Sequence, residues 1–236
     1  RFACERHRRD LVEGKARGLY FDETRAGVAI AFFGMLRHWK GEWAGQRVQL
    51  EPWQQFVIWS LFGWRRADGT RRFRTGYLEV SRKNGKTTMA AGVGLELMVA
   101  DGEPGAEVYT AATKRDQARI SFNDAAEMVR QSPQLRQRIG KVRDNLHSFE
   151  TASKFEPLGR DADSTDGLNV HGVIADELHA WKTRDLWDKL ETATGSRRQP
   201  LMFAITTAGY DRQSLCFTLH DYAEKVASGV IEDDSF

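Results

Sequence analysis

The stretch from residue 77 to residue 88 most constrains what this chain can fold into. A short apolar run leads into a polar loop, and a helix-forming run follows; the loop reads Ser81-Arg82-Lys83-Asn84-Gly85-Lys86-Thr87. In a phosphate-binding loop, backbone N–H groups at a helix N-terminus point at phosphate oxygens, and a glycine allows close approach. A strand, such a loop and a helix in succession predict an α/β domain with a nucleotide at the loop.

Several positions in this loop have an expected task. Gly85 permits the close approach, Lys86 reaches the β- and γ-phosphates, and Thr87 offers its hydroxyl to Mg²⁺. The full pattern has a glycine five residues before Gly85, where this chain has Val80. A solvated turn that carries a lysine is therefore the alternative interpretation. The positions expected to contact the nucleotide are Ser81, Arg82, Asn84, Gly85, Lys86, Thr87 and Thr88.

A second motif lies downstream and is acidic. Residues 173–175 are an apolar run typical of a strand buried on both faces, and the run ends in Asp176 and Glu177. Two adjacent carboxylates at the end of a buried strand are costly unless something there needs them. We expect Asp176 to hold Mg²⁺ and Glu177 to polarise the attacking water in ATP hydrolysis. The alternative is a strand end that happens to meet a charged turn.

Two further segments carry candidate nucleotide contacts. Residues 50–62 predict a helix with Pro52 in its first turn. Gln54 in this helix carries an amide whose donor and acceptor could pair with the edge of adenine, although a surface glutamine is the alternative. Residues 201–209 predict a buried strand, and Thr206 and Thr207 lie at the end where α/β sheets keep their ligands. These threonines are expected to sense the γ-phosphate.

Periodicity and turn residues predict the remaining elements. Helices are expected over residues 28–39, 87–100, 113 onward, 135–139, 186–193 and 214–227, strands over 71–80 and 107–111, and a β-hairpin within 145–157. Thr113 and Asp116 have the spacing of a capping box. Residues 159–167 form a polar loop directly before the acidic strand, and a long polar loop beside two motifs is expected to be functional.

Composition sets the outer bounds. The 236 residues, 41% of them hydrophobic, suit one large domain with a sizeable core. No apolar run approaches the ~20 residues of a membrane span, and Cys4 and Cys216 predict neither a zinc site nor a disulfide framework. The net charge of +2 does not by itself indicate nucleic-acid binding, and most of the short basic runs are expected to be solvated surface. We expect a soluble, intracellular protein.

The order of the motifs resembles that of a known family. Gln54, the loop 81–87, Asp176 with Glu177, and Thr206-Thr207-Ala208 together are similar to the N-terminal ATPase domain of the large terminase subunit of tailed double-stranded-DNA bacteriophages. The loop has the deviant terminase form with an early arginine, which explains Val80. The threonine run resembles the family's coupling motif.

This resemblance implies roles for individual residues. Gln54 matches the adenine motif, Lys86 and Thr87 the phosphate and Mg²⁺ contacts, Asp176 the Walker-B aspartate, and Glu177 the catalytic glutamate. Arg82 matches a loop arginine that responds to the γ-phosphate. The arginine finger donated by a neighbouring subunit is assigned to Arg160, with Arg115 or Arg119 next.

The resemblance also implies a fold and partners. We expect a three-layer, RecA-like ASCE P-loop NTPase fold with a mainly parallel sheet over residues 50–236, a helical and aromatic segment over residues 1–49 that packs on it, and a lid-like C-terminal helix. The expected cofactors are ATP and Mg²⁺. The expected partners are double-stranded DNA, a portal protein, a small terminase subunit and further copies in a ring, in the host cytoplasm and without a membrane. A nuclease domain is expected to be absent from this chain, so no DNA cleavage is predicted.

Two other functions fit parts of the sequence. Asp176-Glu177-Leu178-His179 also spells the DExH box of superfamily-2 helicases, which need a second RecA-like domain. In that comparison His179 is interpreted as a structural residue. A degenerate P-loop fold that binds DNA or a partner without turnover is the non-enzymatic alternative.

Overall fold

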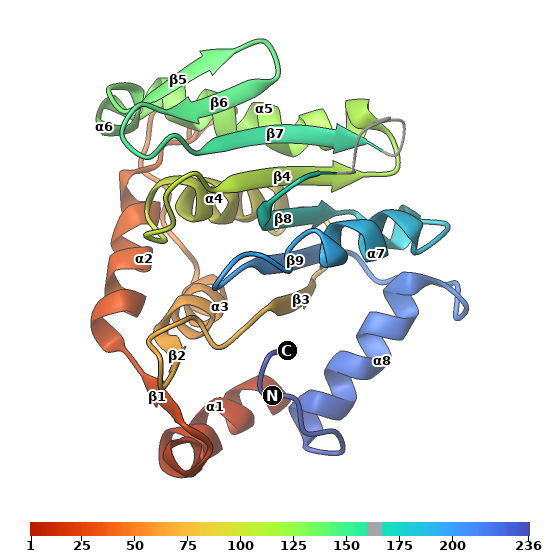
Figure 1. Ribbon diagram of the computed structural model, residues 1–236. Helices are drawn as coiled ribbons and strands as arrows, with labels where there is room; N and C mark the ends of the chain where they lie inside the picture. The colour runs from red at the N-terminus through yellow and green to blue at the C-terminus, as the bar shows by residue number, and fades with distance from the viewer. Residues whose placement is uncertain (160–166) are drawn as a thin grey trace.

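The computed structural model describes residues 1–159 and 167–236, and a mixed sheet lies at its centre (Figure 1). The strands are β1 Leu19–Phe21, β2 Trp64–Arg66, β3 Thr75–Glu79, β4 Glu107–Ala112, β5 Ile139–Val142, β6 Asn145–Ser148, β7 Lys154–Gly159, β8 Val170–Asp176 and β9 Leu201–Thr206. The helices are α1 Phe2–Glu13, α2 Glu23–Met35, α3 Pro52–Gly63, α4 Lys86–Val99, α5 Arg115–Gln131, α6 Pro133–Arg136, α7 Asp185–Thr192 and α8 Leu215–Ser228, with 3₁₀ turns η1 Gly14–Arg17 and η2 Leu178–Ala180.

The strand order places the predicted motifs together. The described strands of the central sheet follow the order β3-β9-β8-β4-β7-β6-β5, and β1 pairs separately with β2. In this order, each strand from β3 to β7 pairs with its neighbour in parallel. Strands β6 and β5 add an antiparallel hairpin at the far edge. Since parallel strands end at the same edge, the end of β9 lies between the strand that precedes the loop and the strand that precedes the acidic pair.

The core has two parts, one on each face of the sheet. Along β9, Phe203 and Ile205 pack with α2 to α5, while Met202 and Ala204 pack with α7 and α8 on the opposite face. Val173, Ile174 and Ala175 of β8 alternate in the same way, and the whole strand is buried. The prediction of strands buried on both faces, typical of a parallel sheet, is confirmed.

Two glycines let α4 pack deep in this core. A Cβ atom at Gly92 would lie 2.3 Å from the ring of Phe33, and one at Gly94 would lie 2.5 Å from the ring of Phe155. Glycine costs about 1 kcal/mol inside a helix relative to alanine, so the close approach must offset this. The helix is held between α2 and the sheet, which fixes the loop at its N-terminus.

Some local predictions differ from the structure. The helix expected over 28–39 spans Glu23–Met35, and the short helix expected over 135–139 spans Pro133–Arg136. The capping box at Thr113 was wrong, because α5 begins at Arg115 and its N-cap residue, Lys114, makes no side-chain cap hydrogen bond. Asp116 pairs with Arg119 instead. Helix α1 and the β5–β6 hairpin were not predicted.

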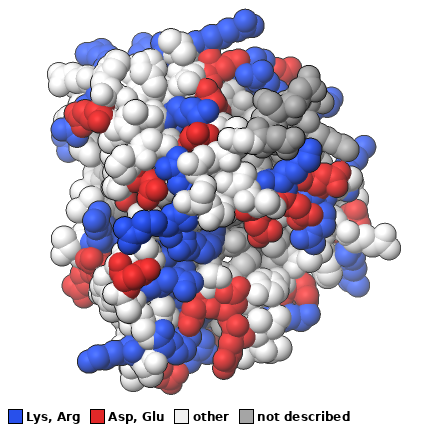
Figure 2. All heavy atoms as spheres, viewed as in Figure 1, with Lys and Arg blue, Asp and Glu red and all other residues white. Residues whose placement is uncertain are grey.

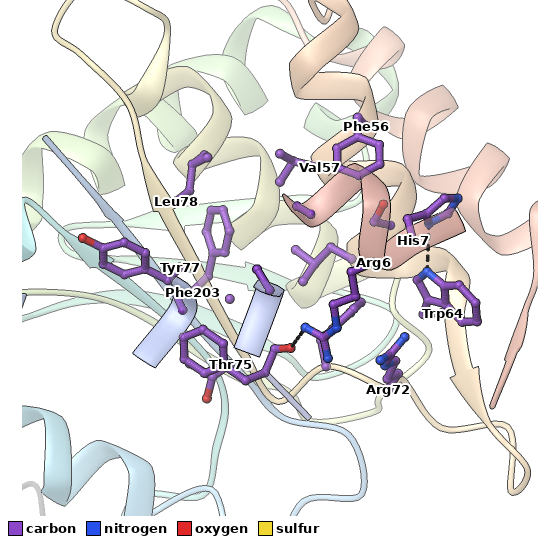
Figure 3. Close-up of a pocket in the computed structure, with 18 of the residues that line it drawn as sticks. Arg6, His7, Phe56, Val57, Trp64, Arg72, Thr75, Tyr77, Leu78 and Phe203 are labelled. Carbon is purple, nitrogen blue, oxygen red and sulfur yellow. Dashed lines mark hydrogen bonds between the residues drawn. The ribbon is translucent and has the colours of Figure 1, made fainter. Parts of the chain in front are cut away.

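The N-terminal segment is connected to the core by specific contacts. Strand β1 pairs with β2, the indole N–H of Trp64 donates to Nδ1 of His7 at 3.0 Å, and Arg6 donates to the carbonyl of Phe236 at 2.6 Å. Figure 3 shows these side chains around a largely apolar cavity of about 200 Å³ beside β3. The division into two units at residue 49 remains a prediction.

Part of the basic sequence 71–74 is not exposed. Arg71 binds both carboxylate oxygens of Asp101 at 2.8 Å, and Arg72 binds Asp10 at 2.8 Å; both arginine side chains are almost fully buried. These two arginines therefore serve as internal ion-pair partners. Figure 2 shows basic and acidic side chains interleaved on the face that it presents, without one continuous basic surface.

None of the described helices has the length and apolar character needed to cross a bilayer.

The buried carboxyl of Glu96, near the ion pair of Arg71 and Asp101, predicts that the stability of the fold depends on pH. Burial and the nearby charge of Asp101 raise the pKa of Glu96 to about 8. This pKa lies above the pKa of a glutamate in the unfolded chain, so the folded chain binds the proton of Glu96 more tightly. The stabilisation from this proton is fully present below about pH 4.5 and is lost as the pH rises through about 8. Replacing Glu96 by Gln removes this dependence.

We expect the free energy of unfolding of Glu96→Gln, relative to the parent chain, to rise by up to about 1.4 kcal/mol per pH unit between pH 4.5 and 8. Urea unfolding at several pH values measures this difference. The exposed Glu191→Gln is the matched control, and its difference from the parent chain should show no such slope. Parallel curves for the parent chain and Glu96→Gln would contradict the prediction.

Candidate functional site

The loop after β3 has the backbone of a phosphate-binding loop. The N–H of Val80 donates to the carbonyl of Thr206 at 3.0 Å, which ties the start of the loop to β9. Lys83 and Gly85 both adopt positive φ, 66° and 72°, and α4 begins directly afterwards at Lys86. Positive φ favours glycine. The loop therefore turns sharply into the helix N-terminus although Val80 stands where the full pattern has glycine.

Side chains of the loop stabilise its shape. The amide of Asn84 donates to Oγ of Ser81 at 2.7 Å, and the ammonium of Lys86 donates to the carbonyls of Val80 and Ser81 at 3.2 and 3.4 Å. Lys86 is buried, whereas residues 81–85 are exposed. The buried lysine thus adjoins a loop whose residues are accessible to solvent.

Gln54 joins helix α3 to this loop. Its Oε1 accepts from the N–H of Glu51 at 2.9 Å, and its Nε2 donates to the carbonyl of Asn84 at 3.3 Å. One amide proton and one lone pair remain, so the side chain keeps a donor and an acceptor. A cavity of about 550 Å³ adjoins it, lined among others by Trp43, Arg47, Trp53 and Thr88. Trp43 and Arg47 come from the segment before residue 50, which sequence reasoning did not connect to this site.

The acidic pair lies at the end of β8 and is held by residues from elsewhere in the chain. The hydroxyl of Ser121, on α5, donates to Oδ2 of Asp176, and the N–H of Glu177 donates to Oδ1 at 2.8 Å. Burial raises the pKa of Asp176, while the Ser121 hydrogen bond and the charge of Lys86 act in the opposite direction. Ser121 is fully buried. Its sequence position on a helical face gave no sign of this role.

His179 connects Glu177 with the end of β9. Its Nδ1 lies 3.1 Å from Oε2 of Glu177 and 3.1 Å from Oγ1 of Thr206, and its backbone N–H donates to the same hydroxyl at 3.1 Å. Thr207 Oγ1 lies 3.3 Å from Nδ1. The structure thus brings the acidic pair and both threonines into one network.

Other predicted site residues have different surroundings. Arg82 is exposed, and within residues 1–159 and 167–236 its guanidinium makes no ion pair. Thr87 and Thr88 lie in the first turn of α4 and are partly buried. Arg160 lies outside the described residues. Of its substitutes, Arg119 pairs with Asp116 and Asp144, at 2.7 and 2.8 Å.

The fold and these motifs define a class of protein. A mostly parallel sheet in which one strand separates the phosphate-loop strand from the acidic strand, with helices on both faces, is the RecA-like ASCE form of the P-loop NTPases. The chain matches the family model for the terminase large subunit, ATPase domain, over residues 52–225. It belongs to this family, as the sequence resemblance predicted, and membership implies ATP hydrolysis.

Individual relatives agree with this assignment. The chain is 28% identical over 188 residues to the large terminase subunit of Enterobacteria phage HK97, covering 77% of this chain and 36% of that protein. It is 38% identical over 69 residues to the protein YmfN of Escherichia coli K12, covering 29% and 15%.

Solved structures show the same similarity. The crystal structure of the HK97 large terminase matches with a TM-score of 0.74 at 27% identity, covering 85% of this chain and 41% of that one. The large terminase ATPase domain of Thermus phage P74-26 matches with a TM-score of 0.50 at 19% identity, covering 61% and 63%, and supports the fold alone. The chain spans less than half the length of the HK97 protein. Because the family and these phage relatives are large terminases, the helicase alternative is not supported.

Proposed function

We propose that this chain is the ATP-hydrolysing motor domain of a DNA-packaging terminase, which moves double-stranded DNA into a procapsid. The observation that supports this most strongly is the placement of three groups at one sheet edge: the loop with Lys86 after β3, Thr206 at the end of β9, and the acidic pair after β8. Phosphoryl transfer from ATP requires a loop that holds the phosphates and a carboxylate that acts on the attacking water. Here the loop and the carboxylate pair follow two strands, β3 and β8, that are separated only by β9.

In this proposal the chain's own residues divide the work. The N–H groups of residues 81–87 and the ammonium of Lys86 bind the phosphates, and Gln54 reads the adenine edge from the adjoining cavity. A hydroxyl and a carboxylate are ligands that Mg²⁺ accepts, so Thr87 and Asp176 fit as its protein ligands. Held by these two residues, Mg²⁺ would supply positive charge that offsets the negative charge of the phosphates. Glu177 orients the attacking water.

Arginines and further subunits complete the proposed site. Arg82, exposed on the loop, is proposed to respond to the γ-phosphate, and Thr206 and Thr207 are proposed to report its presence. Arg160 is proposed as a finger that acts in the site of a neighbouring copy, which requires a ring. Such an arginine stabilises the charge of the transition state. A portal protein, a small terminase subunit and the host cytoplasm belong to the same proposal.

Loss of the loop lysine tests the proposal. We expect Lys86→Ala to lower Mg²⁺-dependent ATP hydrolysis by about 10²- to 10³-fold, because a preorganised cation at the phosphates is lost. Binding of a fluorescent ATP analogue should weaken as well. The exposed Lys189→Ala on α7 is the matched control and should retain the parent activity. Full hydrolysis by Lys86→Ala would overturn the proposed site.

The buried hydroxyl of Ser121 gives a second prediction, on the metal. We expect Ser121→Ala to shift the Mg²⁺ concentration for half-maximal hydrolysis upward by about tenfold, because groups that orient a ligand typically contribute 10- to 100-fold to metal affinity or activity. Ser132→Ala is the matched control, since Ser132 is equally buried and its hydroxyl has no partner among the described residues. Equal shifts in both variants would argue against a role of Ser121 at the metal.

A further inference from the structure

One ring nitrogen of His179 contacts oxygens from two different strand ends. Nδ1 lies 3.1 Å from Oε2 of Glu177, 3.1 Å from Oγ1 of Thr206 and 3.3 Å from Oγ1 of Thr207. Glu177 follows β8, whereas Thr206 ends β9. A single side chain therefore connects the carboxylate proposed to orient water with the hydroxyls proposed to sense the γ-phosphate.

Counting donors and acceptors fixes the role of this nitrogen. An ionised carboxylate offers only lone pairs, so its 3.1 Å ion-pair contact with Nδ1 favours a proton on that nitrogen. The hydroxyl of Thr206 donates its proton to the carbonyl of Thr207 at 2.9 Å and accepts the backbone N–H of His179 at 3.1 Å. Because the single proton of this hydroxyl is used, the hydroxyl acts as an acceptor toward Nδ1, as it does toward Sγ of Cys216 at 4.0 Å. Both threonine hydroxyls therefore hydrogen-bond to the Nδ1–H group, and the Glu177 carboxylate lies within ion-pair distance of the same group.

The backbone under this network is held in a conformation that needs support. Glu177 has φ 50° and ψ 49°, the left-handed region that residues other than glycine adopt at a cost in free energy. The N–H of Ala180 donates to the carbonyl of Glu177 at 2.8 Å, and Glu177 donates its own N–H to Asp176 at 2.8 Å. Strained residues persist where the surroundings over-determine them, commonly at functional sites.

We infer that His179 is a positioning residue that orients the Glu177 carboxylate through Nδ1–H and couples this orientation to Thr206 and Thr207. The inference rests on the proposed function, and it replaces the interpretation of His179 as purely structural. The attraction between Nδ1–H and Oε2 at 3.1 Å holds that oxygen beside the ring and leaves Oε1 to the water. A rotation of the Thr207 hydroxyl changes its hydrogen bond to Nδ1, so a change at the threonines alters the contact between the ring and Glu177.

Two near-isosteric substitutions test the contact at atomic level. The amide atoms of asparagine are attached to Cγ, as Nδ1 of histidine is, whereas glutamine carries them one carbon further out. We expect His179→Gln and His179→Ala to lower kcat by about 10- to 100-fold with nucleotide affinity within about twofold of the parent chain. His179→Asn should recover most of kcat. His147→Asn, on β6 away from the site, is the control.

A double variant tests the coupling to the threonines. If Thr207 acts through His179, His179→Ala combined with Thr207→Val should lose no more than the more damaged single variant. The inference would be overturned if the losses of kcat in the two single variants multiplied in the double variant. It would also be overturned by equal activities of His179→Asn and His179→Gln, or by a loss confined to nucleotide affinity. Urea unfolding of every variant identifies any loss that is due to instability alone.

A second measurement does not depend on hydrolysis. Nitrogen spectra of ¹⁵N-histidine-labelled protein distinguish the two tautomers, and the spectrum of His179→Asn identifies the resonance among the six histidines. We expect a protonated Nδ1 in the parent chain and a changed signal in Glu177→Ala. A protonated Nε2 with no response to Glu177→Ala would overturn the inference. If the parent chain showed this signature without hydrolysing ATP, the proposed function would fail while the contact stood.

Discussion

Replacing Glu177 by Gln is expected to lower ATP hydrolysis by about 10²- to 10⁴-fold while ATP binding is retained. Proton transfer by a positioned side chain typically contributes this factor, and an amide cannot accept the proton of the attacking water. Binding persists because the proposed phosphate contacts come from the loop around Lys86 and not from β8. The measurement combines steady-state phosphate release with titration of a fluorescent ATP analogue.

The control for this substitution is Glu191→Gln, which makes the same chemical change on the exposed face of α7. It should behave as the parent chain in both assays. Unchanged turnover in Glu177→Gln would remove Glu177 from its assigned role, and a parallel loss of nucleotide binding would indicate damage to the loop. The two assays together therefore separate a chemical effect from a structural one.

Arg71→Met is expected to destabilise the folded chain by about 3–5 kcal/mol, because removing one partner leaves a buried charge without compensation. The guanidinium binds both oxygens of Asp101 and also donates to the carbonyls of Phe73 and Gln199. Asp101 is fully buried and also bonds to His171 at 2.8 Å. Burial by itself would raise the pKa of Asp101, but Arg71 and His171 hold it below its usual value.

Urea unfolding at neutral pH measures this effect, and two variants interpret it. Arg184→Met removes an exposed ion pair with Asp188 and should cost at most about 1 kcal/mol. Adding Asp101→Asn to Arg71→Met removes the stranded charge and should recover part of the loss. If Arg71→Met were as mild as Arg184→Met, the buried cluster would contribute little to stability.

Elements with a strong local pattern were predicted well. The buried run 173–175 and the small, apolar run after Lys86 lie in β8 and α4, since continuous burial leaves a continuous apolar sequence. The helix with Pro52 in its first turn was also placed correctly. Local signals failed at Thr113, where Asp116 bonds to an arginine one turn later in place of the helix N-terminus.

The residues of the candidate site likewise differ in whether local sequence could identify them. The loop and the acidic pair were found because their residue types and spacing carry chemistry at short range. Ser121 and His179 were not assigned to the site, because Asp176 and Thr206, to which they hydrogen-bond, lie 55 and 27 residues away in the sequence. The burial of Arg71 and Arg72 was likewise hidden, since a basic run on a flexible surface and one that pairs with distant aspartates look alike in sequence.

By itself, the sequence determined the polar loop between a strand and a helix, the acidic strand end and the family resemblance that the family model then confirmed. Only the tertiary structure decided the strand order that inserts β9 between β3 and β8, and with it the network that joins His179, Glu177 and the threonines. The physical reason is that apolar periodicity specifies which face of an element is buried. The identity of the neighbour is decided when all elements pack together.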